Sequence, residues 1–504
     1  MALEQIFFPF PSVREQQKEL IEDISRVISE KKHLVAHAPT GLGKTVSVLA
    51  PAIAFALREG KTVFFLTPKI SQHQIAVDVV RQMALQFQLN IKAVDLVGKK
   101  YMCSDPLLGS TDFEGFYHVC SKRVKKEQCQ YYKNAVGYSK PEKDIAGIYV
   151  NRLKKNYGAV KNHHELKEMA INAHGAEGER PMCAYEVSHL IARESQVVVG
   201  DYFHLLNPGI QKVTLQRMGK KLEDCIVVVD EAHNLPERLR KILSSALSTF
   251  SVKNACEELK QMNMANLRSN CKLLEKAVLN AAKKKLSGDV KEALLSKETI
   301  LEELKGITDL EAFVGELNSA GVEYLEASGK TRSYITGVSS FLEKWVAESP
   351  ATVRIIKRIG SDGECLVSIQ ALDPALVAKG IFEKTHSTIL MSGTLLPTKM
   401  YANILGLKES RTVLKEYKNP FPKENHLRLV VTDSTTKFTS RNAKEFEKIA
   451  CHISEIANSV PGNSAVFFPS FNVLESVSFF LQGKVSRELI RQKPKMTSTE
   501  RATQ

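Results

Sequence analysis

The hydrophobic positions of the first hundred residues alternate between two spacings. Apolar residues recur every three or four positions from Leu20 to Ile28, behind Ser12 and Glu15, which fit a capping box. Nearly continuous apolar runs at residues 33–37 and 62–66 are typical of buried strands, and each is followed by a helical pattern. This alternation predicts a parallel sheet with helices on both faces, which is an α/β fold.

Farther along the chain the pattern is interrupted twice. It stops from Cys103 to about Arg180, where we expect an insertion, and residues 236–349 are rich in Ala, Leu, Glu and Lys, which predicts a helical lobe. Elsewhere the α/β pattern returns, and a second α/β domain is expected from about Pro420. The further expected strands are at residues 196–199, 225–229, 388–391 and 465–468.

A glycine-rich turn joins the strand at 33–37 to the next helix. Gly41 and Gly43 let the backbone N–H groups turn towards a phosphate, and the helix dipole adds positive potential. Lys44 suits the β- and γ-phosphates of a nucleoside triphosphate, and the Thr45 hydroxyl suits Mg²⁺. A chance glycine-rich turn is the alternative, but the flanking strand and helix favour a phosphate-binding loop. The expected loop comprises Ala38, Pro39, Thr40, Gly41, Leu42, Gly43, Lys44 and Thr45.

Two carboxylates follow the apolar strand at 225–229. Asp230 is placed to hold Mg²⁺ and Glu231 to polarise an attacking water, and His233 completes an Asp-Glu-Ala-His sequence. Acidic residues at the end of a strand can also be plain helix caps. Together with the phosphate-binding loop, however, this pair predicts hydrolysis of ATP.

Composition narrows the class of protein. A chain of 504 residues implies three or four lobes, and no apolar run approaches the roughly 18 residues of a membrane helix. Glu4 and Gln5 stand where a secretory signal needs basic and apolar residues, so we expect an intracellular protein without disulfides among its nine cysteines. The net charge of +14 suits an anionic partner such as nucleic acid, and no membrane partner is expected.

An Asp-Glu-Ala-His sequence behind such a loop is typical of superfamily 2 helicases, and further sequences narrow the match. They are Arg14 and Gln17 before the loop, Asp201-Tyr202, Ser392-Gly-Thr-Leu395, Asn419-Pro-Phe-Pro422 and the segment 463–471. From about Arg14 to about Phe471 the chain resembles the XPD-like iron–sulfur DNA helicases, and most of all the archaeal members. The resemblance implies that Arg14 and Gln17 read the adenine of ATP.

The resemblance also gives four cysteines a role. Cys103, Cys120, Cys129 and Cys183 have the order and placement of the family's ligands for a [4Fe–4S] cluster. Their spacing alone does not indicate this, because it contains no Cys-x-x-Cys pair. A zinc site and four unrelated thiols are the alternatives.

The resemblance further implies a P-loop, RecA-like motor domain that carries two inserted domains. The expected domains are a first motor domain at 1–102, 184–236 and 350–415, an iron–sulfur domain at 103–183, a helical arch domain at 237–349, and a partial second RecA-like domain at 416–504. In the family these parts enclose single-stranded DNA. Residues 122–155 contain ten Lys or Arg, three Asp or Glu and several tyrosines, which suits that path, with a solvated surface loop as the alternative.

The leading hypothesis is an ATP-dependent 5′–3′ DNA helicase that acts on single-stranded and on duplex or fork DNA in repair. It implies ATP, Mg²⁺ and a [4Fe–4S] cluster as cofactors. It also implies a monomer that meets repair proteins, located in the cytoplasm at the nucleoid or, in a eukaryote, in the nucleus.

One family element does not occur in the 504 residues. The Gln-x-x-Gly-Arg-x-x-Arg sequence of motif VI, whose arginine reaches the γ-phosphate, is absent, and so is motif V. Such an arginine contributes about 10³–10⁵ in rate in related enzymes. A second hypothesis is therefore a hydrolysis-deficient module that binds single-stranded DNA or a repair partner. A third, an RNA helicase, gives the four cysteines no role.

Overall fold

The computed structural model describes most of the chain. The described residues are 6–109, 113–158, 160–175, 178–288, 290–307, 309–328, 330, 332–347, 351–359, 363–425, 427–494 and 496. The chain divides into two compact units, Met1–Pro420 and Phe421–Gln504. Within the described ranges, every helix is too short or too polar to cross a membrane.

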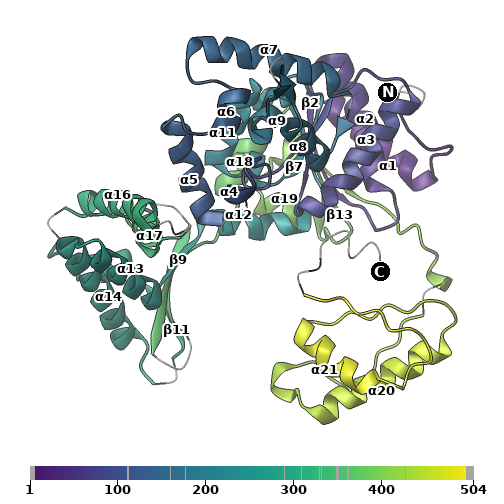
Figure 1. Ribbon diagram of the computed structural model, residues 1–504. Coiled ribbons are helices and arrows are strands. Elements are labelled where there is room, and N and C mark those ends of the chain that lie inside the picture. Colours follow the sequence, from purple (N-terminus) through teal and green to yellow (C-terminus); the bar gives the residue numbers. More distant parts are fainter. Residues whose placement is uncertain are drawn as a thin grey trace. The chain divides into compact units, whose positions relative to one another are not determined.

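A parallel sheet forms the centre of the first unit (Figure 1). In the described residues it has eight strands in the order β14-β1-β13-β8-β2-β7-β3-β4, and all neighbouring pairs are parallel. The predicted α/β fold is confirmed. The strands are β1 (His33–His37), β2 (Thr62–Thr67), β3 (Ala93–Leu96), β4 (Val160–Lys161), β7 (Val197–Asp201), β8 (Cys225–Val229), β13 (Ser387–Ser392) and β14 (Thr412–Glu416).

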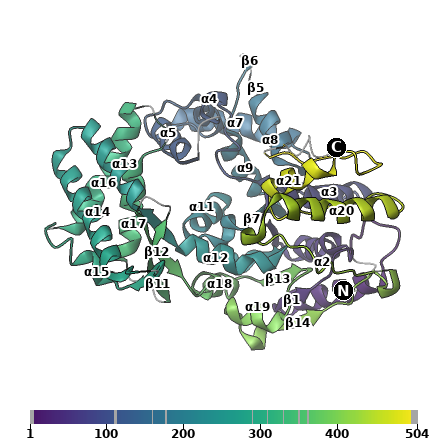
Figure 2. The same ribbon diagram turned by 90° about the horizontal axis from the view of Figure 1, so that it is seen from below.

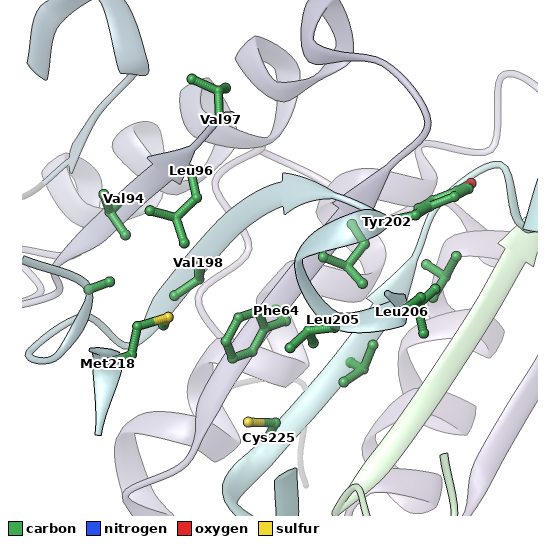
Figure 3. Packing of buried hydrophobic residues seen from close by; sticks show 14 of the residues in the cluster. Phe64, Val94, Leu96, Val97, Val198, Tyr202, Leu205, Leu206, Met218 and Cys225 are labelled. Carbon is green, nitrogen blue, oxygen red and sulfur yellow. The ribbon is translucent and has the colours of Figure 1, made fainter. Parts of the chain in front are cut away.

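Helices cover both faces of this sheet because successive side chains of a strand point to opposite faces. Val63 and Phe65 of β2 pack in the core beneath α1 (Glu15–Ser29), α2 (Lys44–Glu59) and α3 (His73–Gln86). Phe64 of β2 lies in the core of the other face, shown in Figure 3. The helices of that second face are α8 (His163–Ile171), α9 (Ala184–Ala192), α10 (Phe203–Leu206), α11 (Pro208–Met218), α12 (Leu235–Leu243), α18 (Ala375–Phe382) and α19 (Thr398–Ile404).

The first insertion lies between β3 and β7 and is mostly helical. It is tied to the edge of the motor sheet, because β4 pairs with β3 and the buried Tyr157 hydroxyl donates to the Ala93 carbonyl at 2.7 Å. The expected iron–sulfur domain at 103–183 thus contributes one strand to the motor. Its other elements are α4 (Pro106–Gly109), α5 (Phe113–Lys125), α6 (Gln130–Ala135), α7 (Lys140–Asn156), β5 (His174–Gly175) and β6 (Gly178–Glu179).

The second insertion, residues 245–371, is here called the arch lobe. Its helices are gathered against an antiparallel sheet of order β10-β11-β12-β9 (Figure 1). One of the helices, α16, contacts α5 of the first insertion (Figure 2). The elements are β9 (Ser245–Ser248), α13 (Thr249–Gln261), α14 (Ala265–Lys285), β10 (Glu292–Leu295), α15 (Lys297–Leu301), α16 (Leu310–Ser328), α17 (Tyr334–Val346), β11 (Thr352–Ile359) and β12 (Glu364–Ala371).

The arch lobe differs from its prediction as a helical domain ending at residue 349. Residues 350–371 were assigned to the motor with no strand predicted there, but this stretch contains β11 and β12, which pair with each other and with β10 and β9. Helix α12, expected in the arch, instead packs Leu235 and Leu239 into the motor core. The short strands β9 and β10 carry little hydrophobic pattern of their own, and they form because β11 and β12 supply hydrogen-bond partners.

The second unit is small in its described part. Helices α20 (Ala443–Ser459) and α21 (Phe471–Leu481) pack around Ala450, Val473 and Val477. The strand expected at 465–468 does not form, and the Phe467 side chain is 93% exposed. A strand needs a neighbour for its backbone groups, and the described residues of this unit provide none.

Candidate nucleotide and cluster sites

The phosphate-binding loop has the geometry that its glycines predict. It connects β1 to α2, and Gly41 and Gly43 have φ angles of 87° and 79°. A Cβ atom on Gly43 would lie 2.3 Å from Nε2 of Gln17, so a larger residue here would displace that side chain. Gly43 is also the N-cap of α2, which places the free N–H groups of the helix beside the loop.

Arg14 and Gln17 contact this loop from the start of α1. The Arg14 guanidinium donates from Nη1 to the Gly41 carbonyl at 3.0 Å, and Oε1 of Gln17 accepts the Arg14 backbone N–H at 3.0 Å. Helix α1 begins at Glu15, with Arg14 as its N-cap. The capping box expected from Ser12 and Glu15 is therefore replaced by one that involves Gln17, two residues farther along.

A cavity of about 680 Å³ opens beside the loop, large enough for a nucleotide. Six of the predicted nucleotide residues line it, namely Arg14, Gln17, Gly41, Gly43, Lys44 and Thr45, together with Asp230 and Glu231. Ala38, Pro39, Thr40 and Leu42 shape the loop without lining the cavity. The wall also contains Phe8, Phe10, Gln72 and Ile75, which no sequence pattern marked. The available sequence signal for this wall was the aromatic pair Phe8 and Phe10, which precedes Arg14.

Asp230 stands at the end of β8, facing the loop. Its backbone N–H donates to the Leu66 carbonyl at 2.9 Å, which continues the strand pairing by one residue. Burial, and next the charge of Glu231, raise the pKa of Asp230 to about 6. A buried carboxylate whose charge is disfavoured in this way is a suitable ligand for a divalent cation, and the Thr45 hydroxyl lines the same cavity.

Glu231 adopts a conformation that is rare outside glycine, with φ of 48°. Hydrogen bonds to its carbonyl hold it there: the Tyr202 hydroxyl donates at 2.9 Å and the Asn234 side-chain amide at 3.2 Å. Tyr202 also donates to the Asp230 carbonyl. Tyr202, the N-cap of α10, thus holds the strained backbone of Glu231 in place. This is expected if the direction of the Glu231 side chain is important for its function.

Ser392, at the end of β13, connects Glu231 to His233. Its hydroxyl donates to Oε2 of Glu231 at 3.0 Å and lies 2.7 Å from Nδ1 of His233. The Thr394 backbone N–H also donates to this hydroxyl at 3.2 Å. The Ser-Gly-Thr sequence therefore contacts the nucleotide site at two places. Ser392 bonds Glu231, and Gly393 lies so close to the loop that a Cβ atom on it would be 3.3 Å from the Thr40 hydroxyl.

Replacing Ser392 with alanine should lower the maximal rate of ATP turnover about 10–100-fold and leave ATP affinity almost unchanged. The variant removes a hydrogen bond to a charged carboxylate, an interaction of about 1.5–3 kcal/mol, and frees Glu231 to turn. Steady-state kinetics measure both quantities. Ser387→Ala, at the opposite end of β13, removes a hydroxyl that bonds the Lys32 carbonyl and is the matched control. Equal losses in both variants would contradict a role for Ser392 in catalysis.

All four predicted cysteines line one small cavity of about 20 Å³ in the first insertion. They come from separate elements: Cys120 from α5, Cys129 and Cys183 from the N-caps of α6 and α9, and Cys103 from the turn before α4. Cys129 and Cys183 are far apart in sequence, but their segments meet in space. The Cys183 backbone N–H donates to the Tyr131 carbonyl at 2.9 Å.

The donor set has the chemistry of a [4Fe–4S] site. Burial raises the pKa of Cys103, Cys120 and Cys183, to about 12 for Cys183, so these thiols need a cation to ionise. Lys99 lines the cavity and hydrogen-bonds Cys120. In the described residues, His, Cys, Asp and Glu form no group of three or more close enough to bind one metal ion. Four thiols around one cavity are the ligands that a cluster requires.

The chain matches known protein families in its first half. Residues 67–252 match the DEAD_2 family, and residues 14–105 match the DEAD/DEAH box helicase family. The chain is 22% identical over 94% of its length to the general transcription and DNA repair factor IIH helicase subunit XPD/RAD3 of Saccharomyces cerevisiae, and covers 70% of it. It is 22% identical over 78% of its length to the ATP-dependent DNA helicase CHL1 of Kluyveromyces lactis, and spans 49% of that protein.

Solved structures share the fold. An XPD helicase structure superposes with a TM-score of 0.57 at 18% identity, covering 93% of this chain and 75% of the other. Xpd4 of S. tokodaii gives a TM-score of 0.51 at 18% identity, covering 97% of this chain and 78% of the other. These likenesses extend over both insertions as well as the motor. The chain is thus similar in sequence, over most of its length, to XPD/Rad3-like ATP-dependent DNA helicases, and it shares the fold of solved XPD structures.

Proposed function

We propose that this chain moves 5′ to 3′ along single-stranded DNA and opens duplex or fork DNA in repair, at the expense of ATP. The observation that supports this proposal best is the pair of hydrogen bonds made by the Ser392 hydroxyl. This hydroxyl links the catalytic carboxylate of Glu231 to a segment outside the nucleotide cavity, as a motor requires if nucleotide state is to be passed on.

In the proposed mechanism the residues of the cavity divide the work of hydrolysis. Lys44 holds the β- and γ-phosphates, while Thr45 and Asp230 hold Mg²⁺, which neutralises charge on the phosphates when bound. Glu231, kept in place by Ser392, orients a water molecule towards the γ-phosphate. Arg14 and Gln17 also line the cavity and would contact the base.

The two insertions provide a path for a strand. The first insertion and the arch lobe are each attached to the motor, and α5 contacts α16, so these three parts are joined in a closed circuit (Figure 2). The helices α5 and α7 carry eight of the ten Lys and Arg residues of the basic stretch 122–155. Backbone phosphates of single-stranded DNA suit such a surface, and interleaved tyrosines suit its bases. The four cysteines would hold the fold of this insertion through a [4Fe–4S] cluster.

Strand polarity provides the test of this proposal. The full chain is mixed with ATP, Mg²⁺ and fluorescent duplexes that carry a single-stranded tail on either the 5′ or the 3′ side, and with matched RNA tails. Faster unwinding from the 5′ DNA tail is expected. Preference for the 3′ tail would overturn the polarity, and preference for RNA would favour an RNA helicase. Tight binding of single strands without ATP turnover would favour a binding module instead.

A further inference from the structure

A partly buried ion pair lies between the cysteine cavity and helix α11 of the motor: Glu186 is buried, whereas the Arg217 side chain is 33% exposed. Glu186 lies in the first turn of α9, three residues after Cys183, and its side chain is 8% exposed. Arg217 of α11 donates from Nη1 to both carboxylate oxygens of Glu186, at 2.8 and 2.7 Å. Lys99 lies 4.0 Å from the same carboxylate. None of these three residues takes part in the proposed hydrolysis of ATP.

The three charges are arranged around the cavity in a definite order. Lys99 lines the cavity and hydrogen-bonds Cys120, while the Glu186 backbone N–H hydrogen-bonds Cys183. Both cations contact the ring of Tyr185, with Lys99 5.4 Å and Arg217 5.3 Å from its centroid. Glu186 is thus a carboxylate close to Cys183 that Arg217 balances from the motor side, while Asp105, which lines the cavity itself, is paired with Arg123.

The carboxylate acts on the thiols through space. The Glu186 backbone N–H hydrogen-bonds Cys183, and its carboxylate lies 4.0 Å from Lys99, which hydrogen-bonds Cys120. A negative charge held this close to the cysteines opposes added negative charge on a group that they bind. Reduction potentials of iron–sulfur clusters depend on nearby charge and on hydrogen bonds to sulfur.

We propose that Glu186 and Arg217 set the reduction potential of the cluster held by the four cysteines, with Glu186 favouring the oxidised state and Arg217 limiting that effect. The inference rests on the proposed cluster. Reduction adds one electron, supplied by dithionite in the test below, and leaves the four cysteine–iron bonds intact. Glu186 and Arg217 are positioning residues, because they act on the cluster through its surroundings and are not its ligands.

The experiment is a potentiometric titration of the anaerobically purified full chain with dithionite, followed by visible absorbance and electron paramagnetic resonance. Glu186→Gln should raise the midpoint potential and Arg217→Gln should lower it. Arg217→Lys, which keeps the charge, should restore a potential near that of the parent chain. Glu194→Gln is the matched control, since Glu194 likewise has two cationic partners, Lys92 and Lys154.

Opposite shifts in the two glutamine variants would support the inference, because general loosening of the fold would move both in one direction. Shifts of the same sign, or none, with unchanged iron content would overturn it. If Arg217→Gln loses iron, the double variant Glu186→Gln/Arg217→Gln should retain it with a near-parental potential, and its loss there too would contradict an electrostatic role. A parent chain without iron and labile sulfide would overturn the proposed cluster and the inference together.

Discussion

ATP turnover stimulated by single-stranded DNA should fall about 10²–10³-fold when Lys44 is replaced with alanine. Lys44 is the first residue of α2, and it lines the same cavity as Asp230 and Glu231. The variant removes the side-chain cation that faces the phosphates, and preorganised charge of this kind typically contributes that much to the rate. Release of phosphate, measured with and without DNA, gives the ratio directly.

The control for this variant is Lys32→Ala. Lys32 precedes the opposite end of β1 and pairs with Glu30 on the surface, so its loss should leave turnover within about twofold of the parent chain because exposed pairs contribute little. If Lys44→Ala retained DNA-stimulated turnover or unwinding, the loop at 38–45 could not be the site of hydrolysis, and the assignment of Asp230 and Glu231 would fail with it.

Replacing Cys120 with serine should cause the second large effect, loss of most of the bound iron and of the brown colour. Cys120 is buried on α5 and lines the cavity with the other three cysteines. A hydroxyl is a poor substitute for a thiolate in an iron–sulfur site. Iron and labile sulfide per chain are measured after anaerobic purification.

Cys451→Ser serves as the control for the cysteine variant. Cys451 is partly exposed on α20, in the second unit, and contacts Lys484. Its replacement should leave the iron content unchanged. Zinc in place of iron in the parent chain would support the competing metal site, and four reactive thiols without any metal would show that the cysteines are unrelated.

Local sequence was sufficient to predict which residues surround the candidate nucleotide cavity, because the parts of the loop are contiguous. The strand at 33–37, the glycines of the loop and the start of α2 are adjacent in sequence, and each restricts the backbone of the next. The apolar strand at 225–229 likewise ends directly at Asp230. Their meeting in one cavity follows from parallel strands, whose carboxyl ends lie on one edge of the sheet.

Contacts between distant segments could not be predicted in this way. Ser392 reaches Glu231 across more than 150 residues, and its role depends on β13 lying next to β8. The segment of β11 and β12 was assigned to the motor and neither strand was predicted, because the partners that form their sheet are distant in sequence. The Glu186–Arg217 pair was missed for the same reason, since neither residue belongs to a motif.

The strand expected at 465–468 illustrates the opposite error. Val466, Phe467 and their neighbours have the composition of a buried strand, yet Phe467 is 93% exposed. Composition measures what a segment can bury, whereas a strand also needs partners for its backbone. Pattern alone therefore overestimates strands wherever the described residues offer no neighbouring edge.

The most direct test of the central claim is ATP turnover by the anaerobically purified 504-residue chain with and without single-stranded DNA. The account predicts turnover that rises strongly when single-stranded DNA is added and that requires Mg²⁺, because the nucleotide cavity is linked through Ser392 to the rest of the motor. A chain that contains iron and binds single-stranded DNA, but shows no turnover under any of these conditions, would contradict the account and identify a binding module instead.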